Sequence, residues 1–143
     1  FTAVAHRIEY VTEKKGVVYY NDSKGTNPDA AIKGIQAMNR PTLLIGGGYD
    51  KQSGYDEWIE AFDGKVRYLV LIGQTKEKIK EAAEKHGFHD IILCEDLKEA
   101  VKVCEEKAQP GDAVLLSPVC ASWGQFDNYE QRGDMFKEYV RNL

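Results

Sequence analysis

The clearest structural signal in the chain is the run Val66-Arg67-Tyr68-Leu69-Val70-Leu71-Ile72. Its apolar residues follow one another almost without interruption, instead of alternating with polar residues. A strand of this kind is covered on both faces, which is typical of a parallel sheet with helices on each side. Shorter runs of the same character lie at residues 41–45, 91–94 and 113–116. The sequence therefore predicts a largely parallel sheet.

Segments with helical periodicity separate these runs. The first follows Asn27-Pro28-Asp29, which supplies an N-cap, a proline in the first turn and an early acid. Before it, residues 8–11 and 17–20 are β-branched and aromatic and flank Glu13-Lys14-Lys15-Gly16, which is typical of an antiparallel hairpin. Helices are predicted over residues 30–38, 56–62, 75–86, 96–108 and 126–143, with Thr75 as a cap and Gly133 as a weak point. The predicted fold is α/β: a Rossmann-like, doubly wound, mostly parallel sheet with one antiparallel edge hairpin strand.

The composition is that of a single domain over residues 1–143. The chain has 19 Lys plus Arg against 23 Asp plus Glu, a net charge of -4, and 43% apolar residues. This length supports one core, and the acidic balance argues against a protein that neutralises nucleic-acid phosphates. No apolar run approaches the roughly 18 to 20 residues of a membrane span, and the start of the chain does not resemble a signal peptide. We expect a soluble, cytoplasmic domain with no nucleic-acid or membrane partner. The start at Phe1 rather than Met leaves open whether it belongs to a longer chain.

The cysteines and histidines predict structural roles. Cys94, Cys104 and Cys120 include no C-x-x-C pair and have no histidine at zinc-ligand spacing, so neither a metal site nor a disulfide framework is predicted. Cys94 and Cys104 are expected in the core. Cys120 lies in a loop, but no histidine in that segment could activate it as a nucleophile. His86 and His89 are expected to be structural, and no catalytic residue is assigned.

Ligands bind at the carboxyl ends of the strands in such sheets, so the loops there are candidate sites. The first loop is Asn21-Asp22-Ser23-Lys24-Gly25-Thr26-Asn27-Pro28, which leads from a strand into a helix N-terminus. Its acid, hydroxyls and cation could contact a metal, a ribose, a phosphate or a carboxylate. The same residue types are also typical of an ordinary capped loop, so both interpretations stay open.

The second loop is Ile45-Gly46-Gly47-Gly48-Tyr49-Asp50-Lys51. Its three glycines are expected to let a ligand approach backbone N–H groups, with Lys51 within reach. It is not a P-loop, because Gln52 rather than Ser or Thr follows Lys51, and it is not G-x-G-x-x-G, because Lys51 stands where the third glycine is required. The chain therefore carries no nucleotide triphosphate motif of its own.

The third loop is Leu116-Ser117-Pro118-Val119-Cys120-Ala121-Ser122-Trp123-Gly124-Gln125-Phe126-Asp127-Asn128-Tyr129-Glu130. Small hydroxyls and free backbone amides at a helix start suit a carboxylate. A serine nucleophile is not predicted, because there is no G-x-S-x-G elbow and no Asp–His pair in chain order. Trp123, Phe126 and Tyr129 are expected in the core.

Four motifs, which follow one another along the chain, are similar to those of a known protein family. They are His6-Arg7-x-Glu9, Asn21-Asp22-Ser23-Lys24-Gly25-Thr26-Asn27, Gly46-Gly47-Gly48-x-Asp50-Lys51 and Leu116-Ser117-Pro118-x-Cys120-Ala121-Ser122-Trp123-x-Gln125-Phe126-x-Asn128-Tyr129-Glu130-x-Arg132-Gly133. At these spacings the whole chain resembles the C-terminal domain of the Mur ligases. Ser23-Lys24-Gly25-Thr26 and Cys120-Ala121-Ser122 favour the branch that adds D-glutamate over the other Mur ligases and the folylpolyglutamate synthases.

The resemblance implies an ATP-dependent amide ligase of peptidoglycan synthesis. ATP would phosphorylate the terminal carboxylate of UDP-N-acetylmuramoyl-L-alanine, with Mg²⁺, and the amine of D-glutamate would attack the acyl phosphate. The family's enzymes have three domains, and the P-loop and most magnesium ligands lie in the central one. An isolated C-terminal domain would therefore be inactive, and we expect it to be monomeric. The implied ATP contacts are Arg7, Asp22 and Lys24, and the implied D-glutamate contacts are Thr26 and Lys51 at one carboxylate and Ser122 and the backbone amide of Tyr129 at the other.

Simpler interpretations of these residues stand beside this one. Arg7 and Asp22 could form a structural ion pair, Lys51 could be a solvated loop residue, and Ser122 could cap the last helix. Two other functions also remain: a related ligase that adds a different amino acid, and a non-catalytic Rossmann-like module that binds an anion through Gly46-Gly47-Gly48.

Overall fold

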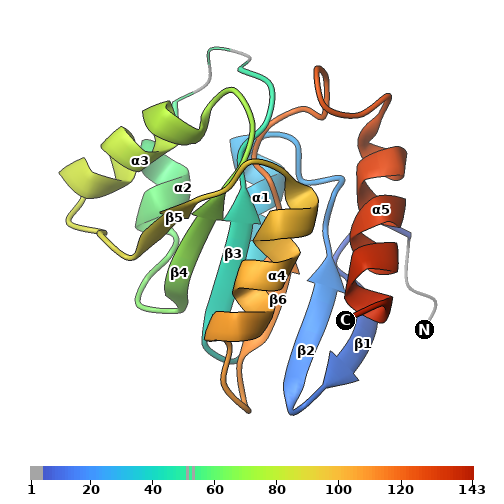
Figure 1. The fold of residues 1–143 in the computed structure, drawn as a ribbon. Helices are drawn as coiled ribbons and strands as arrows, with labels where there is room; N and C mark the ends of the chain where they lie inside the picture. Colours follow the sequence, from blue (N-terminus) through green and yellow to red (C-terminus); the bar gives the residue numbers. More distant parts are fainter. Residues whose placement is uncertain (1–4, 51, 53) are drawn as a thin grey trace.

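A computed structural model describes residues 5–50, 52 and 54–143 of the chain. In these residues one sheet is flanked by helices on both faces (Figure 1). The strands are β1 (Glu9–Lys14), β2 (Val17–Asn21), β3 (Thr42–Gly46), β4 (Val66–Leu71), β5 (Ile91–Leu93) and β6 (Ala113–Leu116). The helices are α1 (Pro28–Ala37), α2 (Asp56–Glu60), α3 (Lys76–Lys85), α4 (Leu97–Lys107) and α5 (Tyr129–Arg141).

The order of the strands confirms the predicted sheet. It runs β1-β2-β6-β3-β4-β5, and every neighbouring pair is parallel except the β1–β2 hairpin at the edge. The last strand, β6, lies between β2 and β3, with Leu116 level with both Asn21 and Ile45. The carboxyl ends of these three strands are therefore adjacent, so the loops that follow them meet at one edge.

The near-continuous apolar strands are explained by a core on each face of the sheet. Leu44, Leu69 and Leu115 face a cluster formed with α1, α2 and α3. Their alternating neighbours Leu43, Val70 and Val114 face a second cluster formed with α4 and α5. Burying both faces removes the polar alternation that a half-exposed strand would show.

Three local features differ from the sequence predictions. Helix α5 begins at Tyr129 rather than at residue 126, because the side chain of Asn128 caps it by accepting from the N–H of Gln131 (2.7 Å). Thr75 precedes α3 but its hydroxyl does not cap it; the oxygen instead accepts from the N–H of Gly48 (3.0 Å). Helix α5 continues without a break through Gly133, the predicted weak point, and the absence of a side chain there makes room for the ring of His6.

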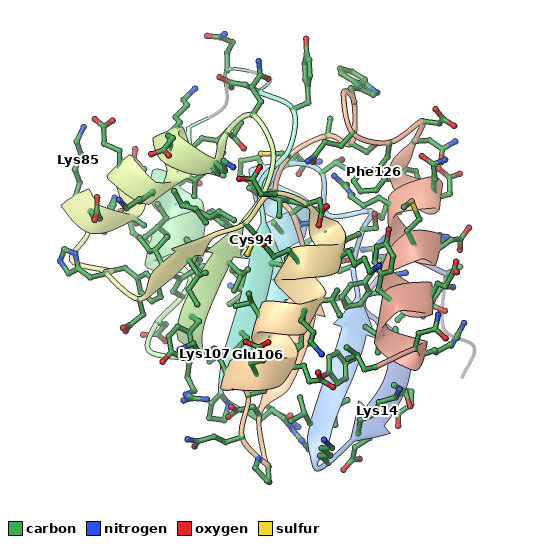
Figure 2. All side chains as sticks on the ribbon, viewed as in Figure 1. Lys14, Lys85, Cys94, Glu106, Lys107 and Phe126 are labelled. Atoms are coloured by element: carbon green, nitrogen blue, oxygen red, sulfur yellow. The ribbon has the colours of Figure 1, made fainter. Side chains whose placement is uncertain are left out.

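The predicted core positions of Cys94 and Cys104 are confirmed. Cys94, Cys104 and Cys120 are all buried and unpaired by disulfides. Cys94 lies between β5 and α4, inside the molecule (Figure 2). Burial raises the pKa of the Cys94 thiol to about 12 and raises the pKa values of the other two thiols, which argues against a thiolate nucleophile. Among the described residues, no helix is both long and apolar enough to cross a bilayer.

Candidate functional site

The three candidate loops form one continuous edge at the carboxyl ends of the strands, at the top of Figure 1. Backbone hydrogen bonds join them to one another. The N–H of Val119 donates to the carbonyl of Gly25 (2.8 Å), which links the loop after β6 to the loop after β2. The N–H of Gly47 donates to the carbonyl of Pro118 (2.9 Å), which links the loop after β3 to the same central loop. The loop after β6 is therefore the common support of the site.

A cavity of about 500 Å³ opens where the loop after β2 meets the start of α5. It is lined by five residues singled out from the sequence, Arg7, Asp22, Lys24, Thr26 and Tyr129, and also by Ile8, Asn27, Asp29, Ala30 and Lys33. The Arg7, Lys24 and Lys33 side chains are exposed to solvent, whereas Asp22 is buried. Exposed cations around a hydroxyl and a helix start make a surface suited to an anion.

Asp22 forms the buried floor of this cavity. One carboxylate oxygen accepts from the hydroxyl of Ser117 (2.7 Å) and the other from the N–H of Ile8 (3.1 Å). Burial raises the pKa of Asp22 to about 6, and these two hydrogen bonds and the charge of Arg7 only partly oppose the effect. The described residues show no ion pair between Arg7 and Asp22, so the structural ion pair considered from the sequence is wrong.

The backbone around Arg7 is strained. His6 and Ile8 on either side have φ angles of 64° and 47°, a region that residues with side chains seldom occupy. Hydrogen bonds hold this conformation: the N–H of His6 donates to Glu9 (3.0 Å), and the N–H of Lys24 donates to the carbonyl of His6 (3.0 Å). Strain of this kind persists where the surroundings fix it, often at functional sites. Here the two hydrogen bonds hold the segment that carries Arg7 against the loop after β2.

The glycine loop after β3 does not work as the sequence predicted. Its glycines were expected to offer free N–H groups to a ligand, but the N–H groups of Gly47, Gly48 and Tyr49 donate to Pro118, Thr75 and Ala121. A Cβ on Gly47 would collide with the carbonyl of Ile72, and one on Gly48 would lie 2.6 Å from the carbonyl of Ala121. The glycines therefore allow close packing between loops, and the prediction of an amide cradle for a ligand is wrong for these positions.

The three remaining predicted contacts are Lys51, Ser122 and Tyr129, of which Tyr129 lines this cavity. Lys51 falls outside the described residues. Ser122 is buried in the loop after β6, where its carbonyl accepts from the N–H of Phe126 (3.0 Å). It does not belong to the described lining of the 500 Å³ cavity. Tyr129 is the first residue of α5, so its N–H has no acceptor within the helix.

Trp123 was expected in the core, and this is wrong. Its side chain is 56% exposed and packs edge-on against Tyr49, which is 39% exposed, with ring centroids 5.2 Å apart. A turn before α5 carries Trp123 out of the core, and the tryptophan that fills the core is Trp58 on α2. Phe126 and Tyr129 are half-buried, with Phe126 beside the upper end of α5 (Figure 2).

Two buried polar residues of the quoted motifs, Asn21 and Arg132, have no role predicted from the sequence, yet both support the loops. Asn21 at the end of β2 contacts Nδ1 of His6 (2.9 Å) and donates to Glu9 (3.1 Å). Arg132 on α5 is 1% exposed and reaches both the loop after β2 and the loop after β6. The signal for Arg132 is its place on the inward stripe of α5, four residues before Phe136 and eight before Val140, where an apolar residue is expected.

Comparisons with known proteins point to one family. Residues 6–120 match the family described as Mur ligase, glutamate ligase domain. The whole chain is 64% identical to a UDP-N-acetylmuramoylalanine--D-glutamate ligase of Lachnoclostridium phytofermentans and 60% identical to the enzyme of the same name of Lachnospira eligens. In both cases it spans 32% of the relative's length.

Solved structures of low sequence identity share the fold. A murein peptide ligase from Psychrobacter arcticus superimposes with a TM-score of 0.68 at 15% identity, over 100% of this chain and 31% of that chain. A folylpolyglutamate synthase from Thermotoga maritima gives a TM-score of 0.67 at 15% identity, over 97% of this chain and 31% of that chain.

Proposed function

The chain belongs to the Mur ligase family, whose glutamate ligase domain it matches, and from this membership we propose that it is the C-terminal, D-glutamate-binding domain of a longer ligase. The longer protein would join D-glutamate to UDP-N-acetylmuramoyl-L-alanine in an ATP-dependent step of peptidoglycan synthesis. The names of the relatives support this proposal, as does the chain's span of about a third of their length. We expect a cytoplasmic monomer that is inactive when isolated.

The observation that carries the proposal is the cavity at the carboxyl edge, which brings Thr26 and Tyr129 together with the exposed cations Arg7 and Lys24. D-Glutamate has two carboxylates and an amine, and its recognition requires positive charge and hydrogen-bond donors at two separated points. We assign one carboxylate to the hydroxyl of Thr26, which lines the cavity, together with Lys51. We assign the other to Ser122 and to the N–H of Tyr129, where the start of α5 adds a favourable dipole.

We assign Arg7, Asp22 and Lys24 to the nucleotide side of the site. Arg7 and Lys24 are exposed cations on the cavity rim and suit phosphate oxygens, while the buried Asp22 holds the backbone of Ile8 in place. ATP would supply activation of the acceptor carboxylate as an acyl phosphate. The chain's own contribution would be to hold the amine of D-glutamate near that carbon, which saves much of the entropy of bringing two reactants together.

Mg²⁺ is proposed to be held mainly by the remainder of the longer protein. Among residues 5–50, 52 and 54–143, no group of three His, Cys, Asp or Glu side chains could hold a metal ion. Two carboxylates, Asp22 and Asp29, line the cavity, and both oxygens of Asp22 already accept hydrogen bonds within the chain. We assign no general base.

Titration calorimetry tests the proposal on the chain itself. We expect weak binding of D-glutamate, weaker binding of L-glutamate, and no hydrolysis of ATP. Equal binding of the two enantiomers, or ATP hydrolysis by this chain alone, would contradict the proposal.

Two alternatives are separated by further measurements. A non-catalytic anion-binding module predicts that Lys51→Ala abolishes binding whereas Thr26→Ala and Ser122→Ala do not. We expect all three substitutions to weaken binding of D-glutamate. A related ligase with another amino acid would be exposed by a panel of amino acids assayed with the full-length protein and ATP.

A further inference from the structure

Arg132 is a buried cation that the proposed chemistry does not use. Its Nη2 donates to the carbonyl of Ser23 (2.7 Å), its Nε donates to the hydroxyl of Ser23 (2.9 Å), and its Nη1 donates to the carbonyl of Cys120 (3.1 Å). Ser23 belongs to the loop after β2 and Cys120 to the loop after β6. One guanidinium from α5 therefore joins two loops that are about 100 residues apart in the chain.

The groups that Arg132 holds lie next to the residues assigned to D-glutamate. Ser23 is three residues before Thr26, and Cys120 is two residues before Ser122. The hydroxyl of Ser23 also donates to the carbonyl of Tyr129 (2.6 Å), at the start of α5. The same cluster thus fixes three of the four places from which the proposed D-glutamate contacts come; the fourth, Lys51, lies in the loop after β3.

The charge of Arg132 has no carboxylate partner among the described residues. Burial lowers the pKa of the guanidinium to about 10, so it stays protonated at neutral pH. A buried charge that only neutral oxygens satisfy is expensive for the fold, and an apolar side chain at this position would avoid that cost. The same charge, however, adds positive potential beneath a site for an anion, where low dielectric strengthens it.

We propose that Arg132 is a positioning residue for the anionic amino acid, setting the spacing of the loops that carry Thr26 and Ser122 and supplying positive charge beneath them. This inference rests on the proposed function for the identity of the ligand. The loop spacing itself does not depend on the ligand.

The test compares Arg132→Lys, Arg132→Met and the control Arg141→Met, which alters an exposed arginine on the same helix. D-Glutamate affinity is measured by titration calorimetry at a temperature where each variant is folded, and amide hydrogen exchange is followed by NMR. We expect Arg132→Met to weaken binding by about tenfold or more, because it removes both the charge and the hydrogen bonds. Arg132→Lys keeps the charge but not the planar guanidinium with its several N–H donors, so its loss of affinity should be smaller. Arg141→Met should bind D-glutamate as tightly as the unchanged chain does.

Hydrogen exchange examines the loop spacing without any ligand. The N–H of Val119, which donates to Gly25 across the two loops, should exchange about tenfold faster in Arg132→Met, while the N–H of Leu44 in β3 should not change. An unchanged exchange rate at Val119 would overturn the positioning role. A lower melting temperature with unchanged D-glutamate affinity would mean that Arg132 is only structural, which would also overturn the proposal. If the unchanged chain binds no D-glutamate, the proposed function fails, and the exchange rate of Val119 still decides whether Arg132 holds the loops.

Discussion

Replacing Asp22 with asparagine is expected to make the protein more stable at neutral pH. Burial raises the pKa of this carboxyl from 3.8 to about 6, so the folded state prefers the neutral form. The difference is about 2.2, and at ~1.36 kcal/mol per pKa unit an ionised Asp22 costs the folded state about 3 kcal/mol. Because the folded-state pKa is the higher one, the neutral carboxyl contributes its full stability below about pH 3.8, and that contribution is lost as the pH rises through about 6.

Asparagine has nearly the same shape and carries no charge. Its oxygen can accept from the N–H of Ile8, and its amide can donate to the hydroxyl of Ser117, which turns to accept. Asp22→Asn should therefore unfold with a free energy higher than that of the unchanged chain by about 3 kcal/mol at pH 7.5, about 1.5 kcal/mol at pH 5 and about 0.5 kcal/mol at pH 4.

Urea unfolding at these pH values measures the difference directly. Because the two chains are compared at the same pH, the contributions of all other titrating groups to the unfolding free energy cancel. Asp90→Asn, at an exposed aspartate, serves as the control and should change the unfolding free energy by no more than about 0.5 kcal/mol. A less stable Asp22→Asn protein at pH 7.5, or a difference that does not change with pH, would refute the account of a buried, destabilised carboxylate. If Asp22 serves the proposed nucleotide site, the more stable variant should also be the less active one in the full-length protein.

Further substitutions test the packing around the site. Gly133→Ala should destabilise the protein by about 1 to 3 kcal/mol in thermal unfolding, because the added methyl would collide with the ring of His6. Gly54→Ala, where an added methyl meets no atom within 4 Å, should be within about 0.5 kcal/mol of the unchanged chain; equal effects at the two glycines would contradict this packing. Trp123→Phe should remove the tryptophan fluorescence that iodide quenches and leave the emission of the buried Trp58; strong quenching in the variant would show that Trp58 is accessible.

The fold could be predicted because its signals are local. The continuous apolar runs at β3, β4 and β6, and the Asn27-Pro28 start of α1, each follow from a few neighbouring residues. The end of α5 nearest the site could not be placed in this way. The side chain of Asn128 starts that helix, and the preceding turn exposes Trp123 although its residue type favours the core.

The sequence could predict which types of residue form the site, but not which residues hold the loops of the site in place. Asp22, Lys24 and Thr26 lie together because they belong to one loop, and the parallel sheet brings that loop beside the start of α5. The roles of Arg132 and of the glycines after β3 depend on groups distant in the chain, such as Ser23 and the carbonyl of Ala121. No pattern within a short segment reveals such contacts.

The central claim is that the carboxyl edge of the sheet binds D-glutamate with a preference for its configuration. The most direct test is an NMR titration of the isotope-labelled chain with D-glutamate and, separately, with L-glutamate. We expect D-glutamate to shift the backbone amides of Lys24, Thr26, Ser122 and Tyr129, and L-glutamate to shift them less at the same concentration. No shift at these amides, or identical shifts with the two enantiomers, would contradict the claim.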